Sequence, residues 1–128
     1  MGPVNLFEFA TRQASWLSAR QSVVAANVAH ADTPGFKAKD VVPFKTVLDR
    51  TQMTMASTHS GHMAPAGSPE PEVVVKRDRA WEMSHSQNSV RIEQELLKAG
   101  EVRREMSLNT SVTKTFHRLL MMSLRGQN

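Results

Sequence analysis

Cysteine is absent from this chain of 128 residues, and aromatic side chains are scarce. Without cysteine the chain can form no disulfide and can use no thiolate as a nucleophile or metal ligand. Only 5% of the residues are aromatic, whereas 40% are hydrophobic overall. That balance suits helices better than a β-sandwich, and the length fits one domain. We therefore expect a single, mainly α-helical domain over residues 1–128.

A long apolar run is also missing. No segment approaches the roughly 18 consecutive apolar residues of a membrane-spanning helix. The first 20 residues lack the apolar centre of a cleavable secretion signal, because Glu8, Arg12 and Gln13 interrupt it. These residues alone predict a cytosolic protein, although the absence of cysteine does not fix the compartment.

Signatures of catalysis and of ligand binding are lacking as well. The sequence contains no P-loop, no dinucleotide-binding fingerprint and no nucleophile elbow. His59 and His62 lie in a polar segment without a scaffold for a metal ion. Glu93 and Glu95 are two apart, so on a helix they point to different faces. We expect no catalytic residue, no metal, no cofactor and no small-molecule substrate.

The charge is mildly basic, +4 with a pI near 10, but it is not concentrated. Positive residues alternate with acids, as where Arg103 and Arg104 stand between Glu101 and Glu105. A basic stripe with interleaved aromatic residues, typical of nucleic-acid binding, is missing. A solvated helix face accounts better for these charges, so we expect no nucleic-acid partner.

What the chain does contain is two segments with a heptad period. Residues 5–32 predict one helix, whose start is marked by Asn5 and Glu8. Its apolar residues recur as in a coiled-coil seam. They are Phe7, Ala10, Ala14, Leu17, Val24, Val28 and Ala31. Gln21 interrupts this seam, and it either fixes the register of packing or is a tolerated, half-exposed residue.

A second apolar row lies beside that seam. It consists of Phe9, Trp16 and Val23. This row broadens the apolar face beyond what one partner helix covers. We expect it to remain available to partner proteins.

Residues 88–125 predict a second long helix. Asn88 or Ser89 can cap it, and Glu93 and Glu95 suit the positive end of the helix dipole. Its apolar residues step by three or four, with a mean near the coiled-coil period. They are Ile92, Leu96, Ala99, Val102, Met106, Val112, Phe116, Leu120 and Leu124. Each helix must cover its stripe, so we expect an antiparallel, coiled-coil-like hairpin.

The intervening residues 33–87 form an irregular middle. Residues 51–71 are rich in Thr, Ser, Gly, Pro and Met, which favours a flexible loop. A short extended piece is expected near Pro43, and Phe44, Val47 and Leu48 are compatible with a short helix. Residues 72–76 are the strongest strand candidate and can pair with an upstream segment.

The most specific stretch ends the first helix. Thr33 precedes a proline, which disfavours the α conformation. Pro34 presets the second position of a type II turn, and Gly35 accepts the positive φ of the third. We therefore predict a rigid corner at residues 33–36, at which any Cβ on residue 35 is unfavourable.

The corner lies within residues 26–38, which read ANVAHADTPGFKA. This stretch resembles the N-terminal signature of bacterial flagellar axial proteins, the rod and hook family. The matching positions are Asn27, Ala29, Thr33, Gly35 and Phe36. Pro34 lies inside the same motif, and His30 stands where the family usually has Asn. The short chain, residues 5–7 and residues 36–44 are most similar to the proximal rod subunits of B type.

The resemblance implies a structural subunit of the flagellar basal-body rod, the periplasm-spanning drive shaft that surrounds the export channel and supports motility. It also implies type III export without a cleaved signal peptide. The implied partners are copies of this chain, other rod subunits, the membrane-ring and rod-anchoring proteins of the basal body, and the export gate.

Two helices make only a thin core, so we expect the remaining apolar surface to pack on neighbouring copies, head to tail and without closure. Both helical segments are expected to be largely disordered in the free monomer and to fold on assembly. Two alternatives stay open: a cytosolic coiled-coil adaptor or export chaperone, and a basic nucleic-acid binder. The residues assigned to packing are Leu17, Val24, Val28, Ile92, Leu96, Met106, Val112, Phe116 and Leu120.

Overall fold

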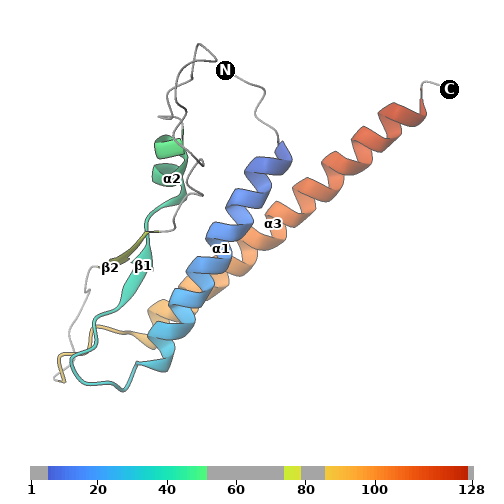
Figure 1. The fold of residues 1–128 in the computed structure, drawn as a ribbon. Coiled ribbons are helices and arrows are strands. Elements are labelled where there is room, and N and C mark those ends of the chain that lie inside the picture. Colours follow the sequence, from blue (N-terminus) through green and yellow to red (C-terminus); the bar gives the residue numbers. More distant parts are fainter. Residues whose placement is uncertain (1–5, 52–73, 79–85, 127–128) are drawn as a thin grey trace, which may run out of the picture.

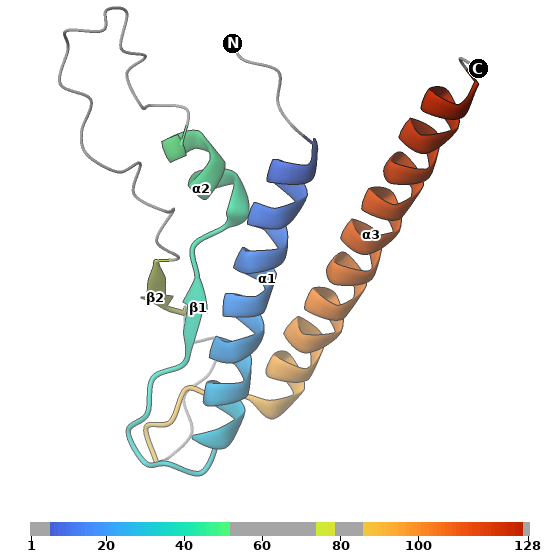
Figure 2. The same ribbon diagram turned by 45° about the vertical axis from the view of Figure 1, so that its right-hand side comes forward.

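The computed structural model describes residues 6–51, 74–78 and 86–126. In chain order they form helix α1 (Leu6–Ala29), strand β1 (Lys39–Val41), helix α2 (Phe44–Thr51), strand β2 (Val75–Arg77) and helix α3 (Ile92–Arg125). Figures 1 and 2 show α1 in the middle, with α3 on one side and the strands and α2 on the other. The expected mainly α-helical fold with long N- and C-terminal helices is confirmed.

α1 and α3 pair in opposite directions. Near the end of α1, the Asn27 amide donates a hydrogen bond to the Glu95 carboxylate, at the start of α3. Near the start of α1, the ring centroids of Phe7 and Phe116 lie 5.5 Å apart. The predicted antiparallel hairpin is thus confirmed. α3 has 34 residues against 24 in α1, and its last part projects beyond α1 in Figures 1 and 2.

The core lies where α1, α3 and β1 meet. Its buried members are Trp16, Leu17, Val41 and Val102, with Val23, Phe44, Val47 and Met106 packed against them. Leu17 is fully buried, and burying a leucine stabilises a fold by about 1.5–3 kcal/mol. The Trp16 indole donates a hydrogen bond to the Val42 carbonyl at 2.8 Å. This bond ties the middle of α1 to the segment that follows β1.

The row of Phe9, Trp16 and Val23 faces the chain's own middle segment. The ring of Phe44, at the start of α2, lies 5.5 Å from that of Phe9 and 5.8 Å from that of Trp16. Val23 packs against the core. The expectation that this row stays available to partner proteins is therefore wrong. The reason is that β1 and α2 fold back along α1, which helical periodicity alone does not reveal.

The face that α3 turns toward α1 differs from the predicted apolar stripe. Glu95, Lys98 and Val102 are buried, whereas Ile92 is 47% exposed and Leu96 is 63% exposed. The expectation that α1 covers the beginning of the stripe is therefore wrong. Charged residues replace apolar ones here because they form ion pairs inside the fold, which offsets the cost of burying them.

Polar residues also lie further along the contact between the helices. The Asn109 amide donates a hydrogen bond to the Ala10 carbonyl at 2.9 Å. Gln21 is half-buried, and among the described residues its Oε1 is buried without a hydrogen-bond partner. An unpaired buried oxygen costs about 1–3 kcal/mol. The half-burial of Gln21 fits the second of the two interpretations, and a role of Gln21 in register stays a prediction.

The middle segment is built around a two-stranded antiparallel sheet. Asp40 in β1 lies opposite Lys76 in β2, and Val41 lies opposite Val75. The predicted pairing with an upstream segment is confirmed, as is the short helix, which is α2. β2 covers Val75–Arg77, and residues 72 and 73 of the predicted strand lie outside the described residues. The predicted loop over residues 51–71 falls almost wholly outside the described residues, together with His59 and His62.

No helix in the described part of the chain is both long enough and apolar enough to span a bilayer.

Candidate functional site at the corner

The corner after α1 is a hydrogen-bonded turn. The Phe36 N–H donates to the Thr33 carbonyl at 3.3 Å, and Gly35 has a φ of 72°. The predicted positive φ at the third turn position is thus present. Nothing lies within 4 Å of a Cβ built on Gly35. A substitution here therefore meets backbone strain rather than a collision with neighbouring atoms.

A second segment, residues 86–89, closes the corner from the other side. The Gly35 N–H donates to the Ser86 carbonyl at 3.0 Å, and the Ser89 N–H donates to the Phe36 carbonyl at 3.1 Å. The Ser89 Oγ accepts a hydrogen bond from the Ala38 N–H at 2.8 Å. The corner is thus held by residues that lie about 50 positions later in the chain.

Asn88 is the centre of this closure. Its Nδ2 lies 2.7–2.9 Å from the carbonyls of His30, Ala31 and Thr33, and its Oδ1 accepts a hydrogen bond from the Val90 N–H. These carbonyls follow the end of α1, where the helix can no longer supply donors. The expected capping of α3 by Asn88 or Ser89 is therefore wrong. α3 begins four residues after Asn88, and its N-cap, Arg91, makes no side-chain cap bond.

Asn27 joins three elements at one point. It is 1% exposed. Its amide donates to the Lys39 carbonyl at 2.7 Å and to the Glu95 carboxylate at 3.0 Å, and its Oδ1 accepts from the Lys39 N–H at 3.1 Å. The side chain therefore connects the last turn of α1 with β1 and with the first turn of α3.

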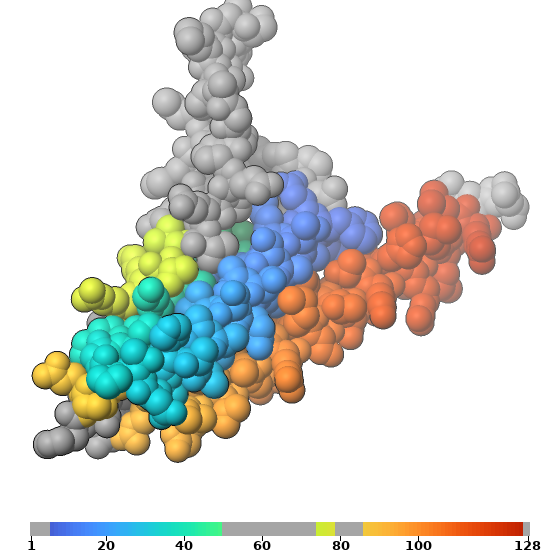
Figure 3. Space-filling model, turned by 60° about the horizontal axis from the view of Figure 1, so that its bottom comes forward, coloured from blue at the N-terminus to red at the C-terminus, as the bar shows by residue number. Residues whose placement is uncertain are grey.

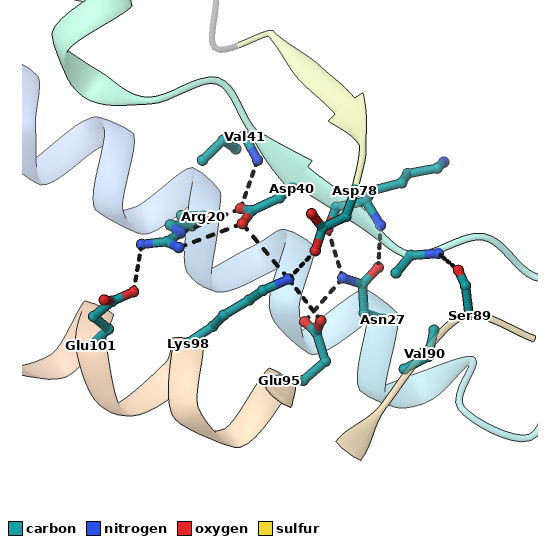
Figure 4. Close-up of polar contacts among 12 residues, drawn as sticks. Arg20, Asn27, Asp40, Val41, Asp78, Ser89, Val90, Glu95, Lys98 and Glu101 are labelled. Atoms are coloured by element: carbon teal, nitrogen blue, oxygen red, sulfur yellow. Dashed lines mark hydrogen bonds and ion pairs between the residues drawn. The ribbon is translucent and has the colours of Figure 1, made fainter. Parts of the chain in front are cut away.

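A cluster of paired charges surrounds Asn27, as Figure 4 shows. The Lys98 ammonium pairs with Asp78 and lies 3.0 Å from Glu95 and 3.7 Å from Asp40. The Arg20 guanidinium, from the middle of α1, lies 3.3 Å from Asp40 and 3.2 Å from Glu101. We call these residues, with Asn27, the polar cluster. The cluster links α1, α3, β1 and the residue after β2.

The polar cluster favours the charged forms of its two cations. Burial by itself lowers the pKa of Lys98, but hydrogen bonds to Asp78 and Glu95 and the nearby negative charges outweigh it, so that the pKa is raised. For Arg20, burial is likewise outweighed by the hydrogen bond and charge of Asp40 and by Glu101, and the pKa is raised. Both side chains are thus held as cations between carboxylates.

His30, which stands where the axial family usually has Asn, keeps polar and apolar partners at the corner. Its ring is stacked on Phe36, with centroids 4.5 Å apart and an interplanar angle of 8°. Its Nδ1 lies 2.8 Å from the Ala26 carbonyl. The stacked pair packs the end of α1 against the turn.

The motif residues predicted from the sequence gather at this corner. Asn27 is buried, Phe36 is half-buried, and Ala29, Thr33, Pro34 and Gly35 are exposed. Of the predicted packing residues, Leu17 and Val24 are buried and Met106 is half-buried. The others are exposed to between 40% and 63%: Val28, Ile92, Leu96, Val112, Phe116 and Leu120.

Sequence reasoning missed the polar cluster and the role of Asn88. One signal was available for Glu95. Stepping back from Val102 by three and then four residues leads through Ala99 to Glu95, so the carboxylate occupies a seam position. Nothing comparable pointed to Asp40 or Asp78, which reach the cluster only because β1 and β2 pair.

The geometry defines a class of protein: a helical hairpin whose polar residues bind the chain's own backbone at a fixed corner. Within the described ranges, no group of three or more His, Cys, Asp or Glu residues is placed to hold a metal ion. The site residues position structural elements, which is the work of a structural subunit.

Comparison with known proteins agrees with this class. A family model described as flagella basal body rod protein matches residues 7–37, which cover α1 and the corner. The flagellar basal body rod protein FlgB of Agrobacterium fabrum is 44% identical over 131 residues, which cover 98% of this chain and 96% of the relative. FlgB of Proteus mirabilis is 45% identical over 47 residues, 37% of this chain and 34% of the relative. The chain belongs to the flagellar basal-body rod protein family.

Proposed function

We propose that this chain is a structural subunit of the flagellar rod and assembles head to tail, with copies of itself and with other rod subunits, at the proximal end of the rod. Membership of the rod family and the 44% identity over nearly the full chain support the structural role. As a rod subunit it carries torque and encloses a channel rather than catalysing a reaction.

The observation that carries the assembly proposal is the apolar surface that the hairpin leaves exposed. Val112, Phe116 and Leu120 on α3 are 46%, 40% and 44% exposed. Exposed apolar side chains that recur along one helix mark an interaction surface. A surface of this kind, together with family membership, supports packing against neighbouring subunits.

The finer parts of the proposal concern route and neighbours. The subunit passes the flagellar type III export gate without a cleaved signal peptide and lies in the periplasmic part of the basal body. There it contacts the membrane-ring and rod-anchoring proteins. The absence of disulfides supports an export route in which the chain passes unfolded.

The organisation into one domain of residues 1–128 is part of the same proposal. The polar cluster supports it, because it joins the first helix, the middle segment and the last helix through side chains. Because the core and the cluster are both buried, we limit the proposed disorder of the free monomer to the C-terminal half of α3.

Fractionation of the native host tests the function. A tagged chain is expressed in place of the native gene, and the cells are separated into cytosol, periplasm and purified basal bodies. We expect the chain in the basal bodies, and we expect its deletion to abolish swimming. A chain that stays in the cytosol as a soluble dimer, with normal swimming after deletion, would instead favour the adaptor or chaperone.

A further inference from the structure

α3 continues well past its contact with the start of α1. Residues 117–125, which we call the overhang, extend the helix by about 14 Å beyond the contact of Phe116 with Phe7. Figure 3 shows this end of α3 projecting away from α1. The overhang contains no acidic residue, and its cations Arg118 and Arg125 are exposed. Its exposed apolar residues are Leu119, Leu120, Met121, Met122 and Leu124.

The overhang prolongs the face that α3 turns toward α1. Leu120 follows Phe116 by four residues, and Leu124 follows Leu120 by four. Both therefore lie on the side of α3 that contacts α1 in the N-terminal part of α3. The surface that fits this face is therefore an apolar helical surface in line with α1. Its charge should be negative, to match Arg118 and Arg125.

The opposite end of the same hairpin presents such a surface. Val28, in the last turn of α1, is 40% exposed, and Ile92 and Leu96, in the first turns of α3, are 47% and 63% exposed. Asp32, four residues after Val28, and Glu93, next to Ile92, are exposed acids. We call these five residues the corner patch. Figure 3 is viewed from this end of the molecule.

We propose that the overhang of one copy docks on the corner patch of the next copy. The proposal rests on the proposed function and names the surfaces that join the subunits. Apolar residues meet apolar residues, and the two exposed arginines of the overhang face the two exposed acids of the patch. The overhang lies beyond one end of the α1–α3 contact, and the corner patch lies at the other end.

Their separation makes the contact intermolecular. Ile92 and Leu120 are about 42 Å apart along the straight axis of α3, so one copy cannot bring its own overhang to its own corner patch. A contact between two different surfaces of identical chains is head to tail, and it adds copies in one direction as an open helix unless the rotation between copies closes a ring. This is the geometry that a growing rod requires.

The natural absence of cysteine provides a direct test. A double variant, Ile92→Cys with Leu120→Cys, is expressed in place of the native chain, and basal bodies are purified and mildly oxidised. A disulfide requires Cα atoms about 4–7 Å apart, so a bond between positions 92 and 120 must join two copies. We expect covalent dimers and higher multimers from the double variant, whereas each single variant stays uncrosslinked.

Leu97→Cys with Leu120→Cys is the matched control. Leu97 is exposed and lies one residue beyond Leu96, but the helix turns it about 100° away from Leu96 and about 140° away from Ile92, the two apolar residues that α3 gives to the corner patch. We expect this pair to give no multimers. All the substituted side chains are exposed, and normal swimming in reducing medium shows that the variants assemble.

The outcomes separate this proposal from the proposed function. Variants that reach the basal body and support swimming, but form no bond between positions 92 and 120, overturn the docking and leave the rod function intact. Bonds only between identical positions also overturn it, since they indicate a symmetric contact. A chain that is absent from basal bodies overturns the rod function, and the docking with it.

Discussion

The side-chain amide of Asn27 pairs with both backbone groups of Lys39, donating to its carbonyl at 2.7 Å and accepting from its N–H at 3.1 Å. Two adjacent β-strands exchange hydrogen bonds in this way, but here one partner is a helical side chain. Because Asn27 is 1% exposed, water cannot replace these bonds. The pairing holds β1 along the end of α1 and so sets the direction of the chain after the corner.

Asn27→Ala should therefore destabilise the isolated chain by about 2–4 kcal/mol, since it leaves both Lys39 groups and one Glu95 oxygen without their partner. Urea unfolding followed by far-UV circular dichroism measures the effect. Ser22→Ala, an exposed position on α1, is the control and should change the midpoint little. Equal midpoints for Asn27→Ala and Ser22→Ala would show that this amide does not hold the corner.

Gly35→Val should impair swimming, and Gly35→Ala should impair it less. At a φ of 72° any side chain strains the backbone by about 1–2 kcal/mol, and a β-branched one by more. Gly100→Ala is the matched control, because Gly100 lies inside α3 with nothing within 4 Å of a new Cβ. It should stabilise the chain by about 1 kcal/mol. Soft-agar swimming and thermal melting report the two effects, and a Gly35→Val strain that swims normally contradicts the argument.

Lys98→Met should cost about 3–5 kcal/mol, because it leaves buried carboxylates without their cation. The Lys98 side chain is 11% exposed and that of Glu95 is 1% exposed, so solvent screens the pair little. Lys98→Met combined with Glu95→Met should be less destabilising than the sum of the two single changes. Lys114→Met, at an exposed position, serves as the control. Additive losses in the double-mutant cycle would mean that the two charges are not coupled.

The stabilisation from Lys98 should also depend on pH in the alkaline range. The pKa of Lys98 is raised in the folded chain above its ordinary value of 10.5. The cation is therefore favoured by folding, and its contribution is fully present below pH 10.5 and lost as the pH rises through the folded pKa. Unfolding midpoints measured from pH 8 upward should fall above about pH 10.5 in the native chain. The same drop, undiminished in Lys98→Met, would assign it to other groups.

Hydrogen exchange should divide α3 into two parts in the isolated chain. Amides near Val102, which is 3% exposed, should exchange slowly, and those of residues 117–125 should exchange quickly. In assembled basal bodies both parts should be protected, because neighbouring subunits cover the exposed face. Slow exchange along the whole of α3 in the free chain would argue against ordering on assembly.

Much of the fold can be predicted from local sequence patterns. The heptad spacing around Leu17 predicts α1, and the Thr33–Pro34–Gly35 sequence predicts the turn and its positive φ, because both depend on short-range sterics. The antiparallel pairing of the helices follows from the need to cover two apolar stripes with one short chain.

The polar cluster cannot be predicted from local sequence patterns. Burial of Glu95 and Lys98 depends on partners brought by β1 and β2, which are distant in sequence. Hydropathy patterns assign charged residues to the surface, so they place Ile92 and Leu96 inside and Glu95 outside. The role of Asn88 is hidden for a similar reason. Its position shortly before α3 predicts that it caps α3, whereas its side chain binds carbonyls that follow the end of α1.

The hydrogen bonds between the corner and residues 86–89 also mean that the corner cannot complete its contacts until this later segment is present. The Gly35 N–H, the Phe36 carbonyl and the Ala38 N–H find hydrogen-bond partners in that later segment, and Leu17 finds Val102 later still. A polypeptide delivered from its N-terminus thus remains incomplete until four-fifths of it has emerged. The leading part of the chain therefore cannot complete either its corner or its core by itself.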